Sequence, residues 1–404
     1  MRARGRPDQN NLYSAAGHRG ALKIALVCDW YLPRAGGLEL HVHDLALQLG
    51  RLGHQVEVVT SIPGPAELEG IPVHRLDVPL CPRHRFALWP RRTMRAIERT
   101  LTAGRYDVVH SHGSIIAPVA YYGAFVAQRL GLPTVLTYHS LFRSFRPLVS
   151  LAAACVDFRR WPVAFSAVSA AVAAEMQPYL GGREIRILRN AVSPEDWRVP
   201  RVRRDPSELW VAAVGRLDWR KRPEALVAAV PRIRARLPPN VRLQVKMAGE
   251  GRERRALERQ IRRLGLEDVV ELLGHRSRAE VRDLLARADV LAMPSTAESF
   301  GIAAFEARCA GLPVVAFEQG GVGEFLRDGC EGFVVKDDEE MTDRLSRLLL
   351  DPALRSRMSE EARRVPPAFT WDRVLPEHLG EYQRAATLAA RSLERSPTRA
   401  VAIE

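Results

Sequence analysis

The chain has 404 residues, enough for two domains of ordinary size, and its 47% hydrophobic and 26% charged residues are typical of a soluble globular protein. Five scattered cysteines without a C-x-x-C pair argue against a zinc site or a disulfide framework and favour a cytoplasmic protein with reduced thiols. The formal net charge of +13 suits a phosphorylated substrate, an acidic lipid surface or a nucleic acid, although a high-GC genome that prefers arginine to lysine would also explain it.

The chain begins with a basic, polar segment, residues 1–20, that lacks the apolar region of a signal peptide. We expect this segment to be a disordered tail. No apolar stretch reaches the roughly 18 to 20 residues that a membrane span requires. The two nearest candidates, 114–127 and 147–156, fit buried helices better.

Strand and helix signals then alternate over residues 21–195. The helix expected at 38–53 has apolar residues spaced three and four apart, which gives it one apolar stripe. Continuous apolar runs predict strands that are buried on both faces of a parallel sheet. The expected strands and helices are 22–30, 38–53, 54–60, 106–113, 118–131 and 133–140, and the segments 164–176 and 184–192 complete the series.

A second series of alternating signals covers residues 205–370, after a Pro- and charge-rich break between 190 and 210. Its repeats of strand, loop and helix are 208–237, 241–265, 268–296, 294–315 and 311–335. Two such series predict an α/β fold of two doubly wound, Rossmann-like domains. Ligands bind beyond the carboxyl ends of such strands, so we expect the site in the cleft between the domains.

The loop "GRLDWRK" (215–221) is the first candidate part of that site. Arg216 and Lys221 follow the first strand of the second series and could reach one anionic group beside a turn at Gly215. Two cations on one loop suit a diphosphate. A solvated loop in a basic protein is the competing interpretation.

The segment "ESFGIAAFE" (298–306) follows another strand and opens a helix. A helix N-terminus with free backbone N–H groups is a phosphate site. Glu298, before the helix, could bind sugar hydroxyls, and Glu306, inside it, could bind a ribose diol. The competing interpretation places both carboxylates on a solvated helix face. The candidate donor-binding residues of this segment are Glu298, Ser299, Phe300, Gly301, Ile302 and Glu306.

The first domain supplies candidate residues for the opposite side of the cleft. Gly36 and Gly37 precede a helix and present bare backbone to a phosphate, but they do not form G-x-G-x-x-G, which argues against a dinucleotide dehydrogenase. Histidines end two strands, and His139 is a better functional candidate than His110 or His112. No His, Asp or Glu cluster has convincing metal spacing, so no metal or other cofactor is predicted.

Taken together and in this order, the motifs resemble those of the family 4 glycosyltransferases, retaining enzymes of the GT-B fold. The resemblance covers about residues 22 to 380. Each motif alone is a weak signal, but nine in the right order are a strong one. The motifs are "GGLELH" (36–41), "VVHSHG" (108–113), "TYHS" (137–140), "AVSAAV" (167–172), "LRNAVSPEDW" (188–197), "GRLDWRK" (215–221), "AGEG" (248–251), "ESFGIAAFE" (298–306) and "GGVGEFLRDG" (320–329).

The resemblance implies roles for the two domains. Residues 21–195 would bind the acceptor, residues 205–370 would bind the nucleotide sugar, and a helix at 371–390 would pack back on the first domain. The catalytic residues would be His139, Glu298, Arg216 and Lys221. The donor would also contact Gly36, Gly37, Gly215, Ser299, Phe300, Gly301, Ile302 and Glu306, with His275 near the nucleobase.

Some positions depart from the family pattern. Gly323 stands where proline is common, "NAVS" replaces "NGVD", and Arg222 and Pro223 follow the lysine where glycine is usual. None of these changes removes a phosphate or sugar contact. They therefore bear on substrate identity more than on the type of reaction.

The resemblance also implies the chemistry. A hexose or N-acetylhexosamine leaves its nucleoside diphosphate, and an acceptor hydroxyl attacks the same face of the anomeric carbon. Since no carboxylate of the first domain is an obvious nucleophile, we favour front-face attack in which the leaving phosphate takes the proton. GDP-mannose, UDP-glucose and UDP-N-acetylglucosamine all remain candidate donors.

The acceptor interpretation rests on two segments, 81–99 and 140–162, which mix aromatic residues and arginines. Both suit an amphipathic surface on anionic lipid, and the motifs are similar to those of phosphatidylinositol mannosyl- and N-acetylglucosaminyltransferases. We therefore expect a cytoplasmic enzyme that also works at the inner face of the membrane. The alternatives are a sugar-nucleotide epimerase or phosphorylase of the same fold, and a nucleic-acid-binding protein, which the lack of an aromatic-interleaved basic patch disfavours.

Overall fold

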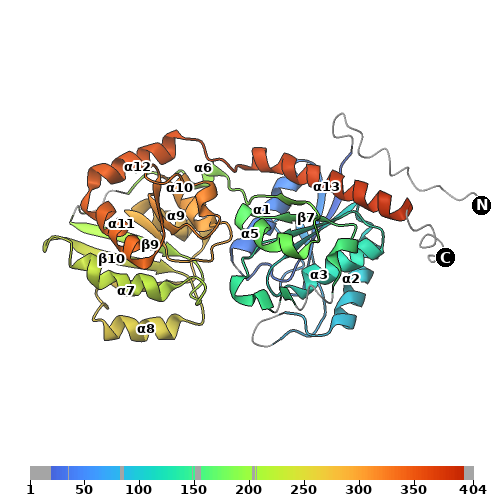
Figure 1. Ribbon diagram of the computed structural model, residues 1–404, viewed down its shortest axis with the longest axis horizontal. Helices are drawn as coiled ribbons and strands as arrows, with labels where there is room; N and C mark the ends of the chain where they lie inside the picture. Colours follow the sequence, from blue (N-terminus) through green and yellow to red (C-terminus); the bar gives the residue numbers. More distant parts are fainter. Residues whose placement is uncertain are drawn as a thin grey trace, which may run out of the picture.

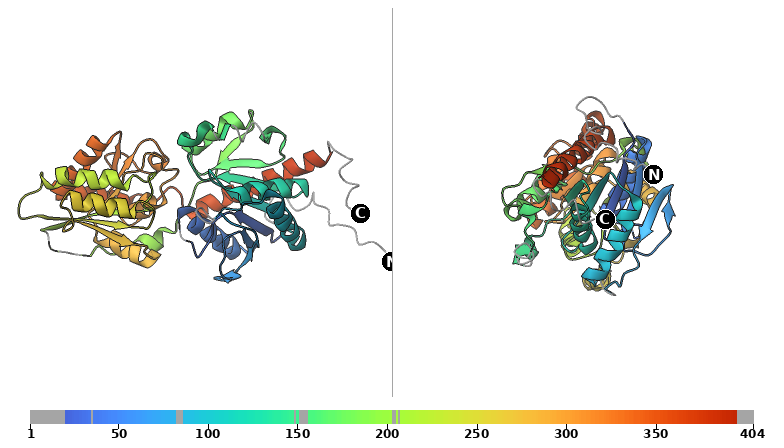
Figure 2. Two further views of the ribbon diagram at one scale, coloured as in Figure 1. Left: turned by 90° about the horizontal axis from the view of Figure 1, so that it is seen from below. Right: turned by 90° about the vertical axis from the view of Figure 1, so that its right-hand side faces the viewer.

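The computed structural model describes residues 20–394 apart from 35, 82–85, 148, 151–155, 203–204 and 206, and side chain 144 is not described. The expected disordered tail and most of the segment 147–156 therefore lie outside the described residues. The chain forms two α/β domains side by side, with the second domain on the left and the first on the right in Figure 1. Figure 2 shows the same pair from below and from one end.

The first domain is built on a parallel sheet. In the part of the chain that the structure describes, this sheet has eight strands in the order β3-β4-β2-β1-β5-β6-β7-β8, and only the short β3 pairs antiparallel, with β4. The strands are β1 (Lys23–Cys28), β2 (Gln55–Thr60), β3 (Glu67–Leu68), β4 (Ile71–Arg75), β5 (Val108–Gly113), β6 (Thr134–Tyr138), β7 (Ala164–Ala167) and β8 (Ile185–Ile187). The central strand β1 is almost entirely buried because helices cover both faces.

The helices of the first domain are α1 (Gly37–Arg51), α2 (Pro90–Gly104), α3 (Pro118–Arg129) and α5 (Ala170–Met176), with 3₁₀ turns at Arg143–Phe145, Phe158–Arg160 and Gln177–Tyr179. The apolar stripe expected of α1 is present, because its buried residues include Val42, Leu45 and Leu49. Helix α2 begins with Pro90 and buries Ala96, Ile97 and Leu101 beside α3. Its other face stays in solvent.

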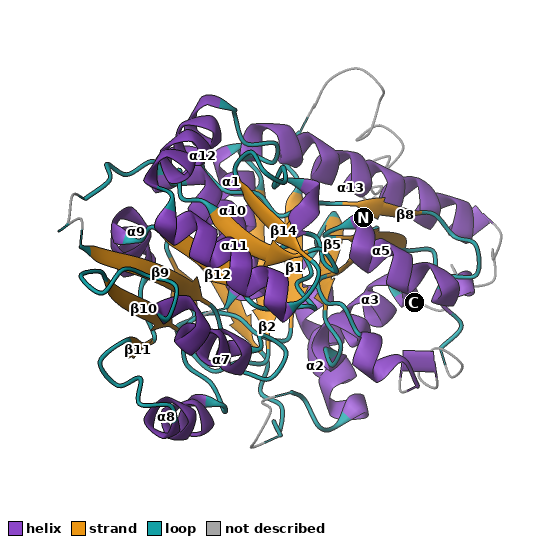
Figure 3. Cartoon of the chain, turned by 60° about the vertical axis from the view of Figure 1, so that its left-hand side comes forward, coloured by secondary structure: helices purple, strands orange, loops and turns teal. Residues whose placement is uncertain are grey.

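The second domain repeats the plan. Its sheet has six strands within the described residues, in the order β11-β10-β9-β12-β13-β14, and its named strand pairs are parallel. The strands are β9 (Glu208–Val214), β10 (Arg242–Ala248), β11 (Val270–Gly274), β12 (Val290–Met293), β13 (Val314–Phe317) and β14 (Gly332–Val335). The helices are α7 (Pro223–Arg234), α8 (Arg254–Arg263), α9 (Arg278–Arg287), α10 (Ile302–Cys309), α11 (Asp338–Leu350) and α12 (Pro352–Arg364), with a 3₁₀ turn at Val322–Glu324. Figure 3 shows the sheets inside and the helices around them.

The chain crosses between the domains twice. A short helix, α6 (Pro194–Trp197), lies in the first crossing and packs beside α10, while the last helix, α13 (Trp371–Glu394), returns to the first domain. In Figure 1, α13 runs over the top of the first domain. Its apolar residues Trp371, Val374 and Tyr382 share a core with β1 and α1. Helix α13 is thus an integral part of the first domain.

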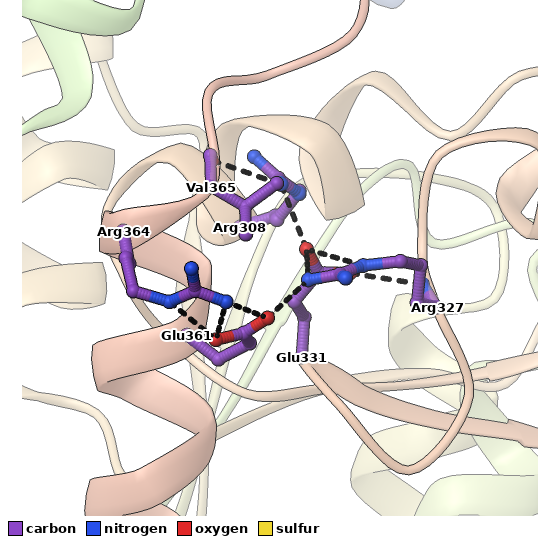
Figure 4. A network of polar contacts seen from close by, with 6 residues as sticks. All are labelled: Arg308, Arg327, Glu331, Glu361, Arg364 and Val365. Atoms are coloured by element: carbon purple, nitrogen blue, oxygen red, sulfur yellow. Dashed lines mark hydrogen bonds and ion pairs between the residues drawn. The ribbon is translucent and has the colours of Figure 1, made fainter.

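An ion-pair network with a buried centre ties α10 to the rest of the second domain. Arg308 in α10 donates to Glu331 Oε1 at 2.7 Å and to the Val365 carbonyl oxygen at 3.2 Å. Arg327 reaches the same glutamate and also Glu361, which pairs with Arg364 at the end of α12 (Figure 4). The network therefore links the helix that carries Glu306 to the segment that leads into α13.

Candidate active site

Two loops of the second domain meet at the carboxyl edge of its sheet. One follows β9 and carries Lys221, and the other follows the adjacent strand β12 and carries Glu298. The Lys221 Nζ lies 2.5 Å from Glu298 Oε2. Because β9 and β12 flank the point where the strand order reverses, this edge is the usual ligand site of such a sheet. The structure thus brings two of the predicted catalytic residues together.

Arg216 lies in the same loop, directly after Gly215, which follows the last residue of β9. Its side chain is 54% exposed, and its Nε lies 3.7 Å from Asp218 Oδ2. An exposed pair at this distance contributes little free energy, so the guanidinium is available to an anion. Lys221 differs from the expectation in one respect, since its ammonium already pairs with the carboxylate of Glu298.

Helix α10 begins beside this pair, and a glycine is required at its start. Gly301 has φ +93°, and a Cβ there would lie 2.6 Å from Val322 Cγ2. The Phe300 ring is buried against Phe305 and Phe325, so only its backbone can face a ligand. The backbone start of α10, not these side chains, is the part that suits a phosphate.

The glycine turn of the first domain faces the start of α10. A Cβ on Gly37 would lie 3.4 Å from Ile302 Cδ1, so the two domains approach closely here. Gly36 is covered from its own side, because a Cβ there would lie 2.5 Å from the Glu39 carboxylate. Glu39, which was not a sequence candidate, is buried and has Arg34 Nε at 3.5 Å from its Oε1.

Glu306 lies deeper in α10, where an ion pair joins the two domains. Arg278 of α9 donates to Asp44 of α1, with 2.8 Å between Nη1 and Oδ1. Burial raises the pKa of Glu306 to about 8, against the lowering effect of the Arg278 charge, and Asp44 raises it further. Neither Arg278 nor Asp44 was a sequence candidate, because their pairing spans 234 residues.

We expect Glu306→Gln to change stability and nucleotide binding in opposite directions. The folded state raises the pKa of Glu306 from 4.5 to about 8, so its contribution to stability is greatest below pH 4.5 and falls as the pH rises to 8. A glutamine does not titrate, so the variant does not lose stability in this way. Its free energy of unfolding should therefore exceed that of the wild type by an amount that grows to a few kcal/mol between pH 5 and 8. Denaturant unfolding across this range measures the advantage, and a constant difference would contradict the assignment. Above pH 8, where the Glu306 carboxylate is charged, affinity for a nucleotide should instead fall about tenfold in the variant, because a charged acceptor for ribose is lost.

His139 belongs to a cluster of buried histidines. Its Nε2 lies 3.0 Å from His112 Nδ1, and its ring also contacts His41, which stacks on Trp371. Burial, and next the charge of His378 in α13, lower the pKa of His139 to about 3. The imidazole is therefore neutral near pH 7 and acts as a hydrogen-bonding group. Among the described residues, no group of three or more His, Cys, Asp or Glu side chains is arranged to hold a metal ion.

The remaining predicted residues have different surroundings. Ser299 contacts the first domain, because its Oγ accepts a hydrogen bond from the Leu141 backbone N–H at 3.0 Å. His275 follows β11 and is exposed, in the loop that leads into α9. His110 bonds Thr137 at 2.7 Å and Tyr382 at 3.1 Å inside the first domain, which fits a structural histidine.

One expected lipid-facing segment lies differently from the prediction. At the start of 140–162, Leu141 and Phe142 are 1% and 4% exposed, and the segment turns toward the second domain. Trp161 is buried too, whereas Arg159 and Arg160 are exposed. Residues 148 and 151–155 lie outside the described part. The start of this segment is therefore a domain contact, because its apolar side chains found partners that the sequence could not show.

The comparisons with known proteins agree with this geometry. Residues 35–196 match the family described as Glycosyltransferase Family 4, and residues 199–365 match that described as Glycosyl transferases group 1. The glycogen synthase of Mycobacterium tuberculosis is 30% identical over 410 residues, which cover 92% of this chain and 96% of that protein. The chain belongs to glycosyltransferase family 4. It is a transferase that moves a sugar from a nucleotide sugar to an acceptor.

A second relative of this glycosyltransferase is the phosphatidylinositol N-acetylglucosaminyltransferase gpi3 subunit of Schizosaccharomyces pombe. It is 27% identical over 343 residues, which cover 81% of this chain and 72% of that protein. Among solved structures, Anabaena HepE in complex with UDP and glucose has a TM-score of 0.66 at 23% identity, covering 89% of this chain and 99% of that one. This likeness confirms the GT-B fold of the enzyme.

Proposed function

We propose that this glycosyltransferase moves a hexose or N-acetylhexosamine from a nucleoside diphosphate sugar to a hydroxyl of an inositol phospholipid, with retention at the anomeric carbon. The observation that carries the donor half is the meeting of Lys221 and Glu298 beside the start of α10. Cations and a helix N-terminus bind the diphosphate, and a carboxylate binds sugar hydroxyls. Anabaena HepE, a protein with this fold, was solved in complex with UDP and glucose, which is in keeping with a nucleotide-sugar donor.

The proposed transfer needs no covalent enzyme intermediate. The bond between the anomeric carbon and the diphosphate oxygen breaks as the acceptor oxygen bonds to the same face of that carbon. The acceptor proton passes to an oxygen of the leaving diphosphate. Arg216, Lys221 and the start of α10 stabilise the charge that grows on that group, which is an effect of preorganised electrostatics. His139, being neutral, orients a hydroxyl by hydrogen bonding.

The acceptor half of the proposal rests on α2. Its solvent side carries Arg91, Arg92, Arg95 and Arg99, and Trp89 beside it is 62% exposed. These residues line a groove of about 1200 Å³. An exposed tryptophan next to clustered arginines suits the boundary of an anionic bilayer. The phosphatidylinositol named for the gpi3 relative is the reason for choosing an inositol lipid. Among the described residues, no helix has the length and apolar composition to cross a membrane.

The donor is tested by thermal stabilisation against UDP, GDP and their sugars. A ligand that binds the native state raises the melting temperature, so we expect one nucleotide and its sugar to shift Tm selectively. Arg216→Ala should lose that shift, whereas Arg252→Ala, at an exposed position before α8, should keep it. A wild-type protein that responds to no nucleotide would overturn the proposal.

The membrane surface is tested by co-sedimentation with phosphatidylinositol vesicles at low salt. We expect R91E/R92E/R95E to bind at least about 100-fold more weakly, since each arginine near an anionic surface contributes about 1 kcal/mol. The matched control is R255E/R259E/R262E, which makes the same charge change on exposed arginines of α8. Equal losses in both variants would show that net charge alone drives binding, and α2 would then not be the membrane surface.

A further inference from the structure

The loop that follows β6 is held by the donor-side loops of the second domain. The Leu141 backbone N–H donates to Ser299 Oγ at 3.0 Å, and its carbonyl oxygen accepts from Arg220 Nη2 at 2.6 Å. One peptide segment of the first domain is thus bound through both of its polar groups. Ser299 lies next to Glu298 in the chain, Arg220 lies next to Lys221, and Leu141 follows two residues after His139.

The same loop is also fixed to its own domain. Buried Glu175 of α5 accepts from the Phe142 backbone N–H at 2.8 Å and from Arg143 Nε at 2.7 Å. A ring contact between Phe145 and Trp219, with centroids 6.2 Å apart, adds an apolar link to the second domain. Both domains therefore hold the loop, so a movement of one domain changes the position of the loop relative to the other domain.

These contacts lie on the residues that flank the transfer site. Lys221 and Glu298 are paired across two loops, and the neighbour of each holds the loop that begins with His139. The Arg220 guanidinium donates a hydrogen bond to the backbone carbonyl of Leu141. It therefore holds the Leu141 loop directly. Removing a guanidinium that donates to a buried carbonyl leaves that carbonyl oxygen without a hydrogen bond.

We propose that Arg220 is a positioning residue for sugar transfer. By holding the Leu141 carbonyl, it keeps the two domains closed and fixes His139 opposite the Lys221–Glu298 pair. Arg220 acts through the loop and does not bind the diphosphate. The inference rests on the transfer site proposed above, between His139 and that pair.

Two other roles make different predictions. If Arg220 were a diphosphate ligand, its removal would weaken nucleotide affinity as much as it lowers kcat/KM. If it only stabilised the fold, its removal would lower Tm without changing kcat. A positioning role predicts a fall in kcat at nearly constant nucleotide affinity, because a displacement of about 1 Å in a site costs about 100-fold in rate.

The first experiment compares Arg220→Gln with Arg282→Gln in the full chain. Arg282 also donates to a backbone carbonyl, that of Asp196 at 3.2 Å, but it does not hold the Leu141 loop. We expect Arg220→Gln to bind UDP or GDP like the wild type in thermal-shift titrations while its kcat with phosphatidylinositol vesicles falls about 100-fold. The control should keep its kcat. A parallel loss of nucleotide affinity, or an unchanged kcat, would overturn the positioning role.

A double-mutant cycle sharpens the test. Ser299 holds the N–H of the same residue, so Arg220→Gln and Ser299→Ala should be non-additive in kcat, and the double variant should lose less than the product of the single losses. Independent, multiplicative losses would contradict a shared action on Leu141.

Small-angle X-ray scattering without substrate gives a measurement that does not depend on the reaction. The Arg220→Gln protein should have a larger radius of gyration than the wild type and the Arg282→Gln control, because the domains separate more readily. An unchanged radius contradicts the inference. Failure of the wild type to bind any nucleotide would instead count against the proposed function, so the two failures are distinguishable.

Discussion

Lys221→Met is expected to lower kcat/KM for sugar transfer about 100- to 1000-fold, which is the usual cost of removing one preorganised donor from the transition state. The ammonium is 2.5 Å from Glu298 Oε2 and lies at the edge of the sheet where we propose that the leaving diphosphate binds. Without it, charge on the leaving group is less stabilised, and Glu298 loses the partner that orients it. The methionine keeps the length and apolar character of the side chain.

Lys246→Met is the matched control for this prediction. Lys246 on β10 also pairs with a glutamate, Glu271, at 2.6 Å, but that partner is 56% exposed. Steady-state kinetics with varied donor separates binding from chemistry. Mainly kcat should fall in Lys221→Met if the lysine acts in the transition state. A rise in KM at unchanged kcat would show instead that Lys221 binds ground state and transition state equally.

The parts of the fold with local signals could be predicted from the sequence. Buried strands such as β1 are continuous apolar runs, and the loops after β9 and β12 follow directly from strand ends. Parallel strands in an open sheet then bring those loops to one edge. This is why the sequence could predict that Lys221 and Glu298 lie at the same edge of the sheet, although it could not predict their direct pairing. No helix or strand was predicted for residues 61–105 and 336–370, where the structure has β3, β4, α2, α11 and α12.

The contacts between the domains could not be predicted in the same way. Arg278 pairs with Asp44, and Arg220 holds Leu141, across separations of 234 and 79 residues. Such pairs depend on how two rigid domains sit against each other, which no local period or propensity reports. The segment that begins at residue 140 shows the consequence. Its apolar and basic residues suggested a lipid surface, but Leu141 and Phe142 found their partners inside the protein.

The same limit applies to the histidine cluster. His139 was a candidate because it ends a buried strand, yet its neighbours come from α1, β5 and α13. A single histidine in a sequence does not show whether it will be solvated or surrounded by others. Its low pKa, and therefore its role as a neutral group, follows only from that packing.

Glu331→Gln is expected to destabilise the protein by about 3 to 5 kcal/mol, because it leaves the buried charge of Arg308 without its partner. The Glu331 side chain is 0% exposed and that of Arg308 is 3% exposed, so water cannot replace the lost carboxylate. Figure 4 shows Glu331 between Arg308 and Arg327. Denaturant unfolding measures the loss. Glu258→Gln is the matched control, since its pair with Arg254 at 3.0 Å is part-exposed and contributes at most about 1 kcal/mol.

The pH dependence of the free energy of unfolding gives a second, independent test of this prediction. Burial by itself would raise the pKa of Glu331, but the bonds from Arg327 and the charge of Arg308 outweigh it and hold the pKa below its usual value. A lowered pKa in the folded state means that the stability is present above the usual pKa of glutamate and is lost as the pH falls through the folded value. The difference between wild type and Glu331→Gln should therefore shrink on acidification. A difference that stays constant, or a loss no larger than that of Glu258→Gln, would show that Arg308 finds another partner and that α10 does not depend on this network.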